Sequence, residues 1–140
     1  MTQEKPRYVK PLPVPNTESA PFWDACKEHR LQVQRCKRCS QFYFYPRSHC
    51  PFCHQGDVEW VQCSGKGRVH TFTVVRQNMA PGFREEVPYV VAIVELEEDG
   101  VQLMANIVEC DSGDVSIGMP VQVAFDDVTE EVTLARFKPA

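Results

Sequence analysis

Two Cys-x-x-Cys pairs constrain this chain more than any other feature of its sequence. The first pair is Cys36 and Cys39, and the second, after a spacer of ten residues, is Cys50 and Cys53. Each pair can hold two thiolates on one tight turn, so the two pairs together can supply the four corners of a tetrahedron. Four sulfur ligands leave no open coordination position, which is typical of a structural zinc site. A segment with little core of its own would then fold around the metal.

Other chemistries also use paired cysteines. The N-terminus does not resemble a signal peptide, which argues against an oxidising compartment and against disulfides. A thioredoxin-like redox motif would have one pair at the start of a helix, whereas here two pairs flank the aromatic stretch Phe42–Tyr45. Iron accepts four thiolates as zinc does, so a rubredoxin-type iron site is the alternative metal centre. His49 and His54 adjoin the second pair, and we expect them to lie beside the metal rather than replace a cysteine.

Length and composition are those of a soluble globular protein. The 140 residues suffice for one ordinary domain, or for a small domain with an appendage. No apolar run approaches the roughly 18 residues of a membrane span, so we expect a cytoplasmic protein without a membrane partner. Three of the seven cysteines, Cys26, Cys63 and Cys110, lie outside the two pairs, and we expect them to be small buried residues with reduced thiols.

The net charge of −4 is distributed unevenly. Basic residues dominate between Lys27 and Arg47, whereas from Glu85 to Ala135 the chain has many acidic residues and no lysine or arginine. The basic region could meet phosphate groups or an acidic protein surface. The acidic remainder argues against non-specific nucleic-acid binding, because it would repel the phosphate backbone.

The N-terminal part is expected to form an arm and a helix. Four prolines disfavour a helix over residues 1–17, which we expect to be an extended arm, either disordered or laid across a partner. Residues 18–31 are expected to be helical, with Phe22, Cys26 and His29 on one face. Because so short a helix is marginal in water, it must pack on something. Phe22 and Trp23 are candidate anchors for a partner interface, and a core role is the alternative.

After residue 62, predicted strands and turns alternate at steady intervals. The predicted strands are Arg68–Arg76, Tyr89–Glu97, Val101–Val108, Val121–Phe125 and Glu131–Phe137. Five short strands in about 70 residues predict a closed barrel of the OB type, with an SH3-like barrel as the competitor. Cys63–Gly67 lacks the residue order of a phosphate-binding loop and is expected to be a turn. The prediction is therefore a mainly β chain, with a helix and rubredoxin-like zinc ribbon over residues 18–62 and an OB-fold domain over residues 63–140.

The connection between the first two predicted barrel strands is unusually apolar. Within Gln77–Val87 it holds Met79, Pro81, Gly82 and Phe83. An exposed apolar cluster usually marks an interaction site. We therefore expect this loop to reach a hydrophobic ligand or partner, and folding back over the barrel mouth is the alternative.

Several motifs in combination resemble one known family. They are Phe22-Trp23, the four-cysteine ribbon, Phe44–Arg47, Gly65–Gly67, Phe72–Val75, Pro81–Phe83, Pro88-Tyr89, Gly118–Val121 and Phe125–Thr129. From about Ala20 to its C-terminus the chain resembles the acyl-CoA-associated zinc-ribbon/OB-fold family, once known only as a domain of unknown function.

The resemblance implies an accessory subunit. Members of that family pair with thiolase-like proteins, such as thiolases, hydroxymethylglutaryl-CoA synthase assemblies and steroid side-chain aldolases, often as heterotetramers. They help to form an acyl-CoA site in the partner, so the expected ligands are structural Zn²⁺ and a shared coenzyme A ester. The residues expected to face coenzyme A phosphates or the partner are Arg35, Lys37, Arg38 and Arg47. The loop Met79–Phe83 would close over the acyl or pantetheine portion.

We expect no catalytic residue in this chain. Thiolase chemistry needs a nucleophilic cysteine, activating histidines and an oxyanion site in a deep pocket. The three cysteines outside the ribbon have no obvious local histidine partner, and a ribbon with a small barrel hardly buries a coenzyme A ester. The alternative function is a single-stranded nucleic-acid-binding module, but Tyr89–Glu97 and Val101–Val108 lack lysine and arginine.

Overall fold

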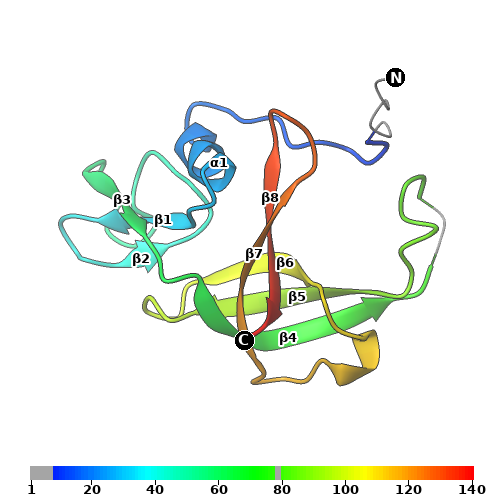
Figure 1. Ribbon diagram of the computed structural model, residues 1–140. Helices are drawn as coiled ribbons and strands as arrows, with labels where there is room; N and C mark the ends of the chain where they lie inside the picture. The colour runs from blue at the N-terminus through cyan, green and yellow to red at the C-terminus, as the bar shows by residue number, and fades with distance from the viewer. Residues whose placement is uncertain (1–7, 78–79) are drawn as a thin grey trace.

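The computed structural model describes residues 8–77 and 80–140 (Figure 1). Its first part is a short helix followed by a small antiparallel sheet with the strand order β2-β1-β3. These elements are α1 (Ala20–Lys27), β1 (Gln32–Cys36), β2 (Phe42–Tyr43) and β3 (Val58–Gln62). Met79 of the predicted apolar loop and the first seven residues of the predicted arm lie outside the described residues.

The second part is a closed barrel with the strand order β4-β5-β6-β8-β7. Its elements are β4 (Lys66–Val75), β5 (Tyr89–Leu96), β6 (Gln102–Ile107), the 3₁₀ helix η1 (Ser112–Asp114), β7 (Pro120–Asp127) and β8 (Thr133–Pro139). Neighbouring strands are antiparallel, except that β6 meets β8 in parallel, with Ile107 opposite Phe137. The predicted mainly β architecture with a five-stranded barrel is confirmed.

The core of the barrel follows from alternation along its strands. In β5 the buried side chains are Val90, Ala92, Val94 and Leu96, every second residue, because successive side chains of a strand point to opposite faces. Phe137 of β8 is completely buried among them. Burial of these apolar side chains is the main stabilisation of the barrel.

The predicted turn over Cys63–Gly67 is wrong for its last two residues, which belong to a strand. The strand β4 already begins at Lys66, and only the residues before it form a bend. A Cβ atom on Gly67 would lie 2.4 Å from the carbonyl oxygen of Glu95 on β5, so the backbones approach too closely here for a side chain.

The helix is shorter than predicted because the chain turns sharply after it. Reciprocal hydrogen bonds between Asn16 and Ser19 precede α1, and Pro21 occupies its first turn. Beyond Lys27, His29 has a φ of 58°, a left-handed conformation that cannot continue a helix. His29 therefore lies outside the face formed by Phe22 and Cys26, contrary to the prediction. No helix within residues 8–77 and 80–140 has the length and hydropathy needed to cross a bilayer.

Candidate zinc centre and adjoining surfaces

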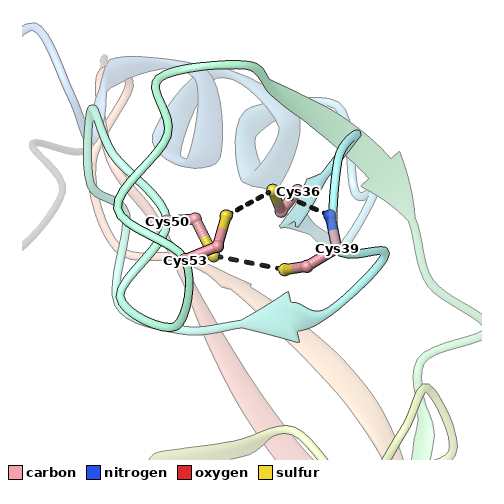
Figure 2. A group of neighbouring side chains, drawn as sticks. All are labelled: Cys36, Cys39, Cys50 and Cys53. Atoms are coloured by element: carbon pink, nitrogen blue, oxygen red, sulfur yellow. Dashed lines mark hydrogen bonds between the residues drawn. The ribbon is translucent and has the colours of Figure 1, made fainter.

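The four cysteines of the two pairs converge at one end of the small sheet (Figure 2). Their Sγ atoms all lie within 4.8 Å of one another. The Sγ atoms of Cys36 and Cys53 are 3.5 Å apart, and those of Cys39 and Cys50 are 3.6 Å apart. Zinc–sulfur bonds of about 2.3 Å in a tetrahedron require sulfur–sulfur distances of about 3.8 Å. The cysteines therefore fit a structural zinc ion, which they would hold as four thiolates.

Backbone amides favour the thiolate form of two of these cysteines. The N–H groups of Cys39 and Phe52 donate to the Sγ atoms of Cys36 and Cys50, each over 3.4 Å. The hydrogen bond from Cys39 lowers the pKa of Cys36 to about 7. Burial opposes ionisation of Cys50, but amide hydrogen bonds lower the pKa of its thiol. Because the thiolate is the metal-binding form, the turns prepare both sulfurs for the metal.

The two histidines beside the second pair do not belong to the ligand cluster. His49 and His54 are exposed, and the group of close ligand atoms consists of the four cysteines. The Nδ1 atom of His49 lies 3.0 Å from the Oγ atom of Ser48. The four cysteines thus form the complete ligand set among the described residues.

Acidic neighbours partly neutralise the predicted basic surface. Arg35 lies 3.8 Å from Glu59, and Lys37 lies 3.9 Å from Asp57. The guanidinium of Arg35 also lies over the ring of Phe42, at 5.4 Å from its centroid. Two further cations of the ribbon, Arg38 and Arg47, are exposed and form no ion pair within residues 8–77 and 80–140. Among the described residues, Arg38 and Arg47 are thus the two of the four predicted ribbon cations that have no acidic partner.

The predicted apolar loop divides into an exposed part and a part that folds back. Pro81 is exposed, whereas Phe83 is half-buried, with its ring centroid 5.6 Å from that of Tyr89. Phe83 lines a cavity of about 710 Å³ at the end of the barrel, together with residues of β6, β7 and β8. Phe83 therefore adopts the arrangement given as the alternative, folding over the barrel mouth.

The two predicted interface aromatics lie in different environments. Phe22 is only 7% exposed and packs against Trp23 and Phe44, with centroid distances of 5.1 and 5.2 Å. Trp23 is half-buried and borders a second cavity of about 360 Å³ between α1, the ribbon and the barrel. Tyr45 and Met104, 56% and 59% exposed, line the same cavity. The sequence reasoning missed Met104, although its outward position in the alternation of β6 could have revealed it.

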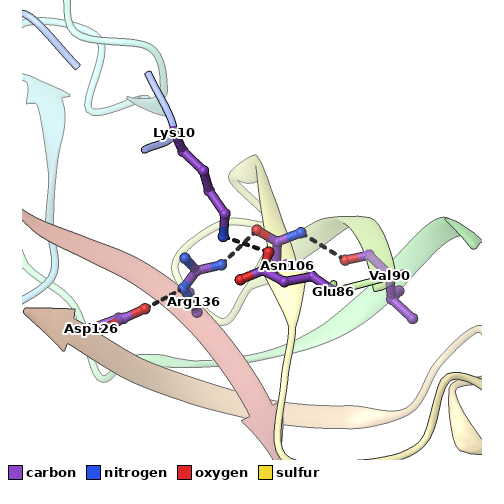
Figure 3. Close-up of polar contacts among 6 residues, drawn as sticks. All are labelled: Lys10, Glu86, Val90, Asn106, Asp126 and Arg136. Carbon is purple, nitrogen blue, oxygen red and sulfur yellow. Dashed lines mark hydrogen bonds and ion pairs between the residues drawn. The ribbon is translucent and has the colours of Figure 1, made fainter. Parts of the chain in front are cut away.

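A polar network joins four strands of the barrel (Figure 3). Arg136 of β8 donates to Asp126 of β7 at 2.8 Å and to the Oδ1 atom of Asn106 at 2.9 Å. Asn106 of β6 in turn donates to the carbonyl oxygen of Val90 on β5 at 3.0 Å. Asn106 and Arg136 line both cavities. This network could not be predicted from a sequence motif, because its members are far apart in the chain.

The buried thiols outside the ribbon are poor nucleophiles. Burial raises the pKa of Cys26 to about 12. Burial and the charge of Glu98 raise the pKa of Cys63 to about 12. Both cysteines therefore remain protonated near neutral pH and pack as apolar residues, as the sequence predicted. Cys110, the third cysteine outside the ribbon, is only half-buried, so the prediction of a buried residue is wrong there.

Comparison with known proteins agrees with this arrangement. Residues 23–59 match the family model described as the ChsH2 rubredoxin-like zinc ribbon domain, and residues 60–126 match the ChsH2 C-terminal OB-fold domain. A DUF35 domain-containing scaffold protein of Methanocaldococcus jannaschii is 43% identical over 112 residues, which cover 78% of this chain and 77% of that protein. A probable enoyl-CoA hydratase alpha subunit of Thermomonospora curvata is 37% identical over 139 residues, and this chain spans 43% of its length.

A solved structure shows the same fold. A chain of the structure titled Ltp2-ChsH2(DUF35) aldolase superposes with a TM-score of 0.83 at 36% sequence identity, covering 91% of this chain and 98% of that chain. The agreement extends over the zinc ribbon and the barrel together. The chain therefore belongs to the ChsH2 (DUF35) family, in which a rubredoxin-like zinc ribbon precedes an OB-fold domain.

Proposed function

We propose that this chain is a non-catalytic, zinc-binding subunit of a thiolase-type or aldolase-type enzyme that makes or breaks carbon–carbon bonds of acyl-CoA esters. It would help to form the acyl-CoA site and stabilise the catalytic subunit, as part of a cytoplasmic heterotetramer. The likeness to a chain of the Ltp2-ChsH2(DUF35) aldolase, over 91% of this chain, carries the proposal. The relatives named as a scaffold protein and as a hydratase alpha subunit support a subunit role.

The zinc centre supports a structural role for the ribbon. Four thiolates fill the coordination sphere of zinc and leave no position for a substrate. A metal held in this way fixes the ribbon loops but does not polarise a carbonyl. The raised pKa values of Cys26 and Cys63 make these two buried thiols poor candidates for attack on a thioester.

The exposed groups have chemistry that suits a shared site. Arg38 and Arg47 can meet coenzyme A phosphates or acidic groups of the partner. Pro81 and Phe83 offer apolar surface for an acyl or pantetheine segment. Trp23, at the rim of the smaller cavity, is a suitable anchor for the partner subunit.

The barrel strands support the proposal over the nucleic-acid alternative. β5 and β6 contain no lysine or arginine, and Glu95 adds negative charge. An OB fold that binds single strands combines aromatic rings with a positively charged groove. Weak binding to single-stranded oligonucleotides is therefore expected.

The central test is reconstitution with the partner. Affinity purification of the tagged chain from its native host should recover a thiolase-like protein, and acyl-CoA turnover should require both chains. Turnover of an acyl-CoA ester by this chain alone at an enzymatic rate would contradict the proposal. Recovery of a bound nucleic acid, displaced by single-stranded oligonucleotides in a salt-dependent way, would instead favour the nucleic-acid-binding module.

A pair of double variants tests the basic residues. Arg38→Gln with Arg47→Gln should weaken acyl-CoA binding or complex formation by about tenfold, the equivalent of 1.4 kcal/mol. Arg35→Gln with Lys37→Gln removes the same charge from cations that already have acidic partners, and serves as the matched control. Equal effects of the two double variants, or no effect of either, would exclude Arg38 and Arg47 from the site.

A further inference from the structure

The N-terminal arm, residues 8–16, forms one wall of the larger cavity. In Figure 1 it runs from α1 past the ends of β7 and β8 toward the connection between β4 and β5. Its residues Tyr8, Lys10 and Pro11 line the 710 Å³ cavity, opposite walls contributed by β6, β7 and β8. Among the described residues, no backbone hydrogen bond joins residues 8–15 to another element. The arm can therefore move away from the cavity without breaking any backbone hydrogen bond of the barrel strands.

Lys10 attaches the arm to the β4–β5 connection (Figure 3). Its ammonium group forms an ion pair with Glu86 and lies 5.0 Å from the centroid of the Phe83 ring. The Lys10 side chain is only 10% exposed, which is low for a lysine. A partly desolvated ion pair with a cation–π contact is stronger than an ordinary surface pair.

Gly82 provides a second point of attachment. A Cβ atom at this position would lie 2.9 Å from the Cγ atom of Lys10 and 2.9 Å from the Cγ2 atom of Val9. The φ of Gly82 is 85°, which side-chain-bearing residues rarely adopt. The arm therefore rests on bare backbone of the same loop that supplies Phe83 and Glu86.

Residues 11–15, between Lys10 and the start of α1, make little contact with the rest of the chain. Val14 is 91% exposed, and Leu12 is also exposed. Pro11, Pro13 and Pro15 stiffen this segment, because proline restricts the backbone. The reciprocal Asn16–Ser19 hydrogen bonds hold its other end beside α1. A stiff segment held at two ends moves as a unit when one end is released.

We propose that the arm is a displaceable strap, latched by Lys10 to Glu86, Phe83 and Gly82, that forms one wall of the larger cavity. Releasing the latch opens the barrel end and exposes Phe83 and Tyr89. Because the latch includes an ion pair, high ionic strength favours the open form. The strap is a property of this chain by itself and does not depend on the identity of a catalytic partner.

Limited proteolysis measures the open form directly. Chymotrypsin should remove residues 1–8 by cleavage after Tyr8, at a rate that tracks the open population, followed by mass spectrometry. Glu86→Lys should raise this rate by about tenfold, because it places two cations together. Glu85→Lys is the matched control, since Glu85 is a neighbouring exposed carboxylate without an ion pair among the described residues, and its rate should stay within about twofold of wild type.

The charge swap completes the test. The double variant Lys10→Glu with Glu86→Lys should return the cleavage rate to within about threefold of wild type. Binding of 8-anilinonaphthalene-1-sulfonate should rise in Glu86→Lys and fall again in the double variant. Equal cleavage of the Glu86→Lys and Glu85→Lys variants, or failure of the swap to restore protection in a chain with unchanged circular dichroism, would overturn the strap.

Discussion

The zinc ribbon and the barrel reach stability by different means. The ribbon end encloses a small cluster in which Cys36, Tyr43 and Cys50 are buried, so most of its interior consists of metal ligands. The barrel instead contributes most of one large cluster, which includes Val94, Val121 and Phe137. The ribbon therefore depends on coordination bonds, and the barrel depends on buried apolar area. Damage to one region need not destroy the other.

Removing the metal should have the largest effect and should fall on the ribbon. Zinc binding at four-thiolate sites contributes on the order of 10–16 kcal/mol of apparent free energy near neutral pH. We expect a chelator, or Cys36→Ser, to unfold residues 36–58 while barrel amide signals persist in NMR spectra. Metal analysis of the untreated protein should give one zinc per chain and no iron absorbance. A metal-free chain with an intact ribbon spectrum would contradict this dependence.

Truncating Phe137 should destabilise the barrel instead. Phe137 is completely buried, and Phe→Ala at such positions costs about 3–5 kcal/mol. We expect this loss in the free energy of unfolding from urea titration, while the folded fraction keeps its zinc. Ile117→Ala, at an exposed loop position, is the control and should change stability by less than about 0.5 kcal/mol.

Substitutions of Phe22 and Trp23 test the packing of α1 between the ribbon and the barrel. Because Phe22 is buried in the shared core, Phe22→Ala should cost about 3 kcal/mol of stability. Trp23→Ala should cost less, and under the proposed function it should weaken binding of the partner more than Phe22→Leu does. Calorimetry of the single chain and titration of the partner separate the two effects. A larger stability loss from Trp23→Ala would reverse the assignment.

The smallest effect concerns Asp127, which connects β7 to the segment after α1. The hydroxyl of Thr133 and the ring of His29, with its Nε2 atom 3.0 Å from the carboxylate, lower the pKa of Asp127. A depressed carboxyl pKa stabilises the folded state above the unfolded pKa of about 3.9, and this is lost as pH falls through the folded pKa. Between pH 5 and 3 the Tm should therefore fall slightly more in wild type than in Asp127→Asn. Glu130→Gln, which alters an exposed carboxyl nearby, should leave the wild-type slope unchanged.

The sequence by itself determined the metal ligands and the strand pattern. In each Cys-x-x-Cys turn the local backbone geometry brings two sulfur atoms together. Along Tyr89–Leu96, buried and more exposed side chains alternate with the two-residue period of a strand. Both signals are complete within a few residues, so they need no knowledge of distant neighbours. The early end of α1 escaped prediction because the left-handed conformation of His29 has no strong residue signature.

Only the tertiary structure decided which side chains are available for contacts. It buried Phe22 but left Trp23 at a cavity rim, and it paired Arg35 with Glu59. It also brought Lys10 to Glu86 and Arg136 to Asn106. The physical reason is that charge pairing and burial depend on residues that are remote in sequence and meet only when the barrel closes. The sequence tells how many charged and apolar side chains the protein has, but the closed fold decides which of them contact one another.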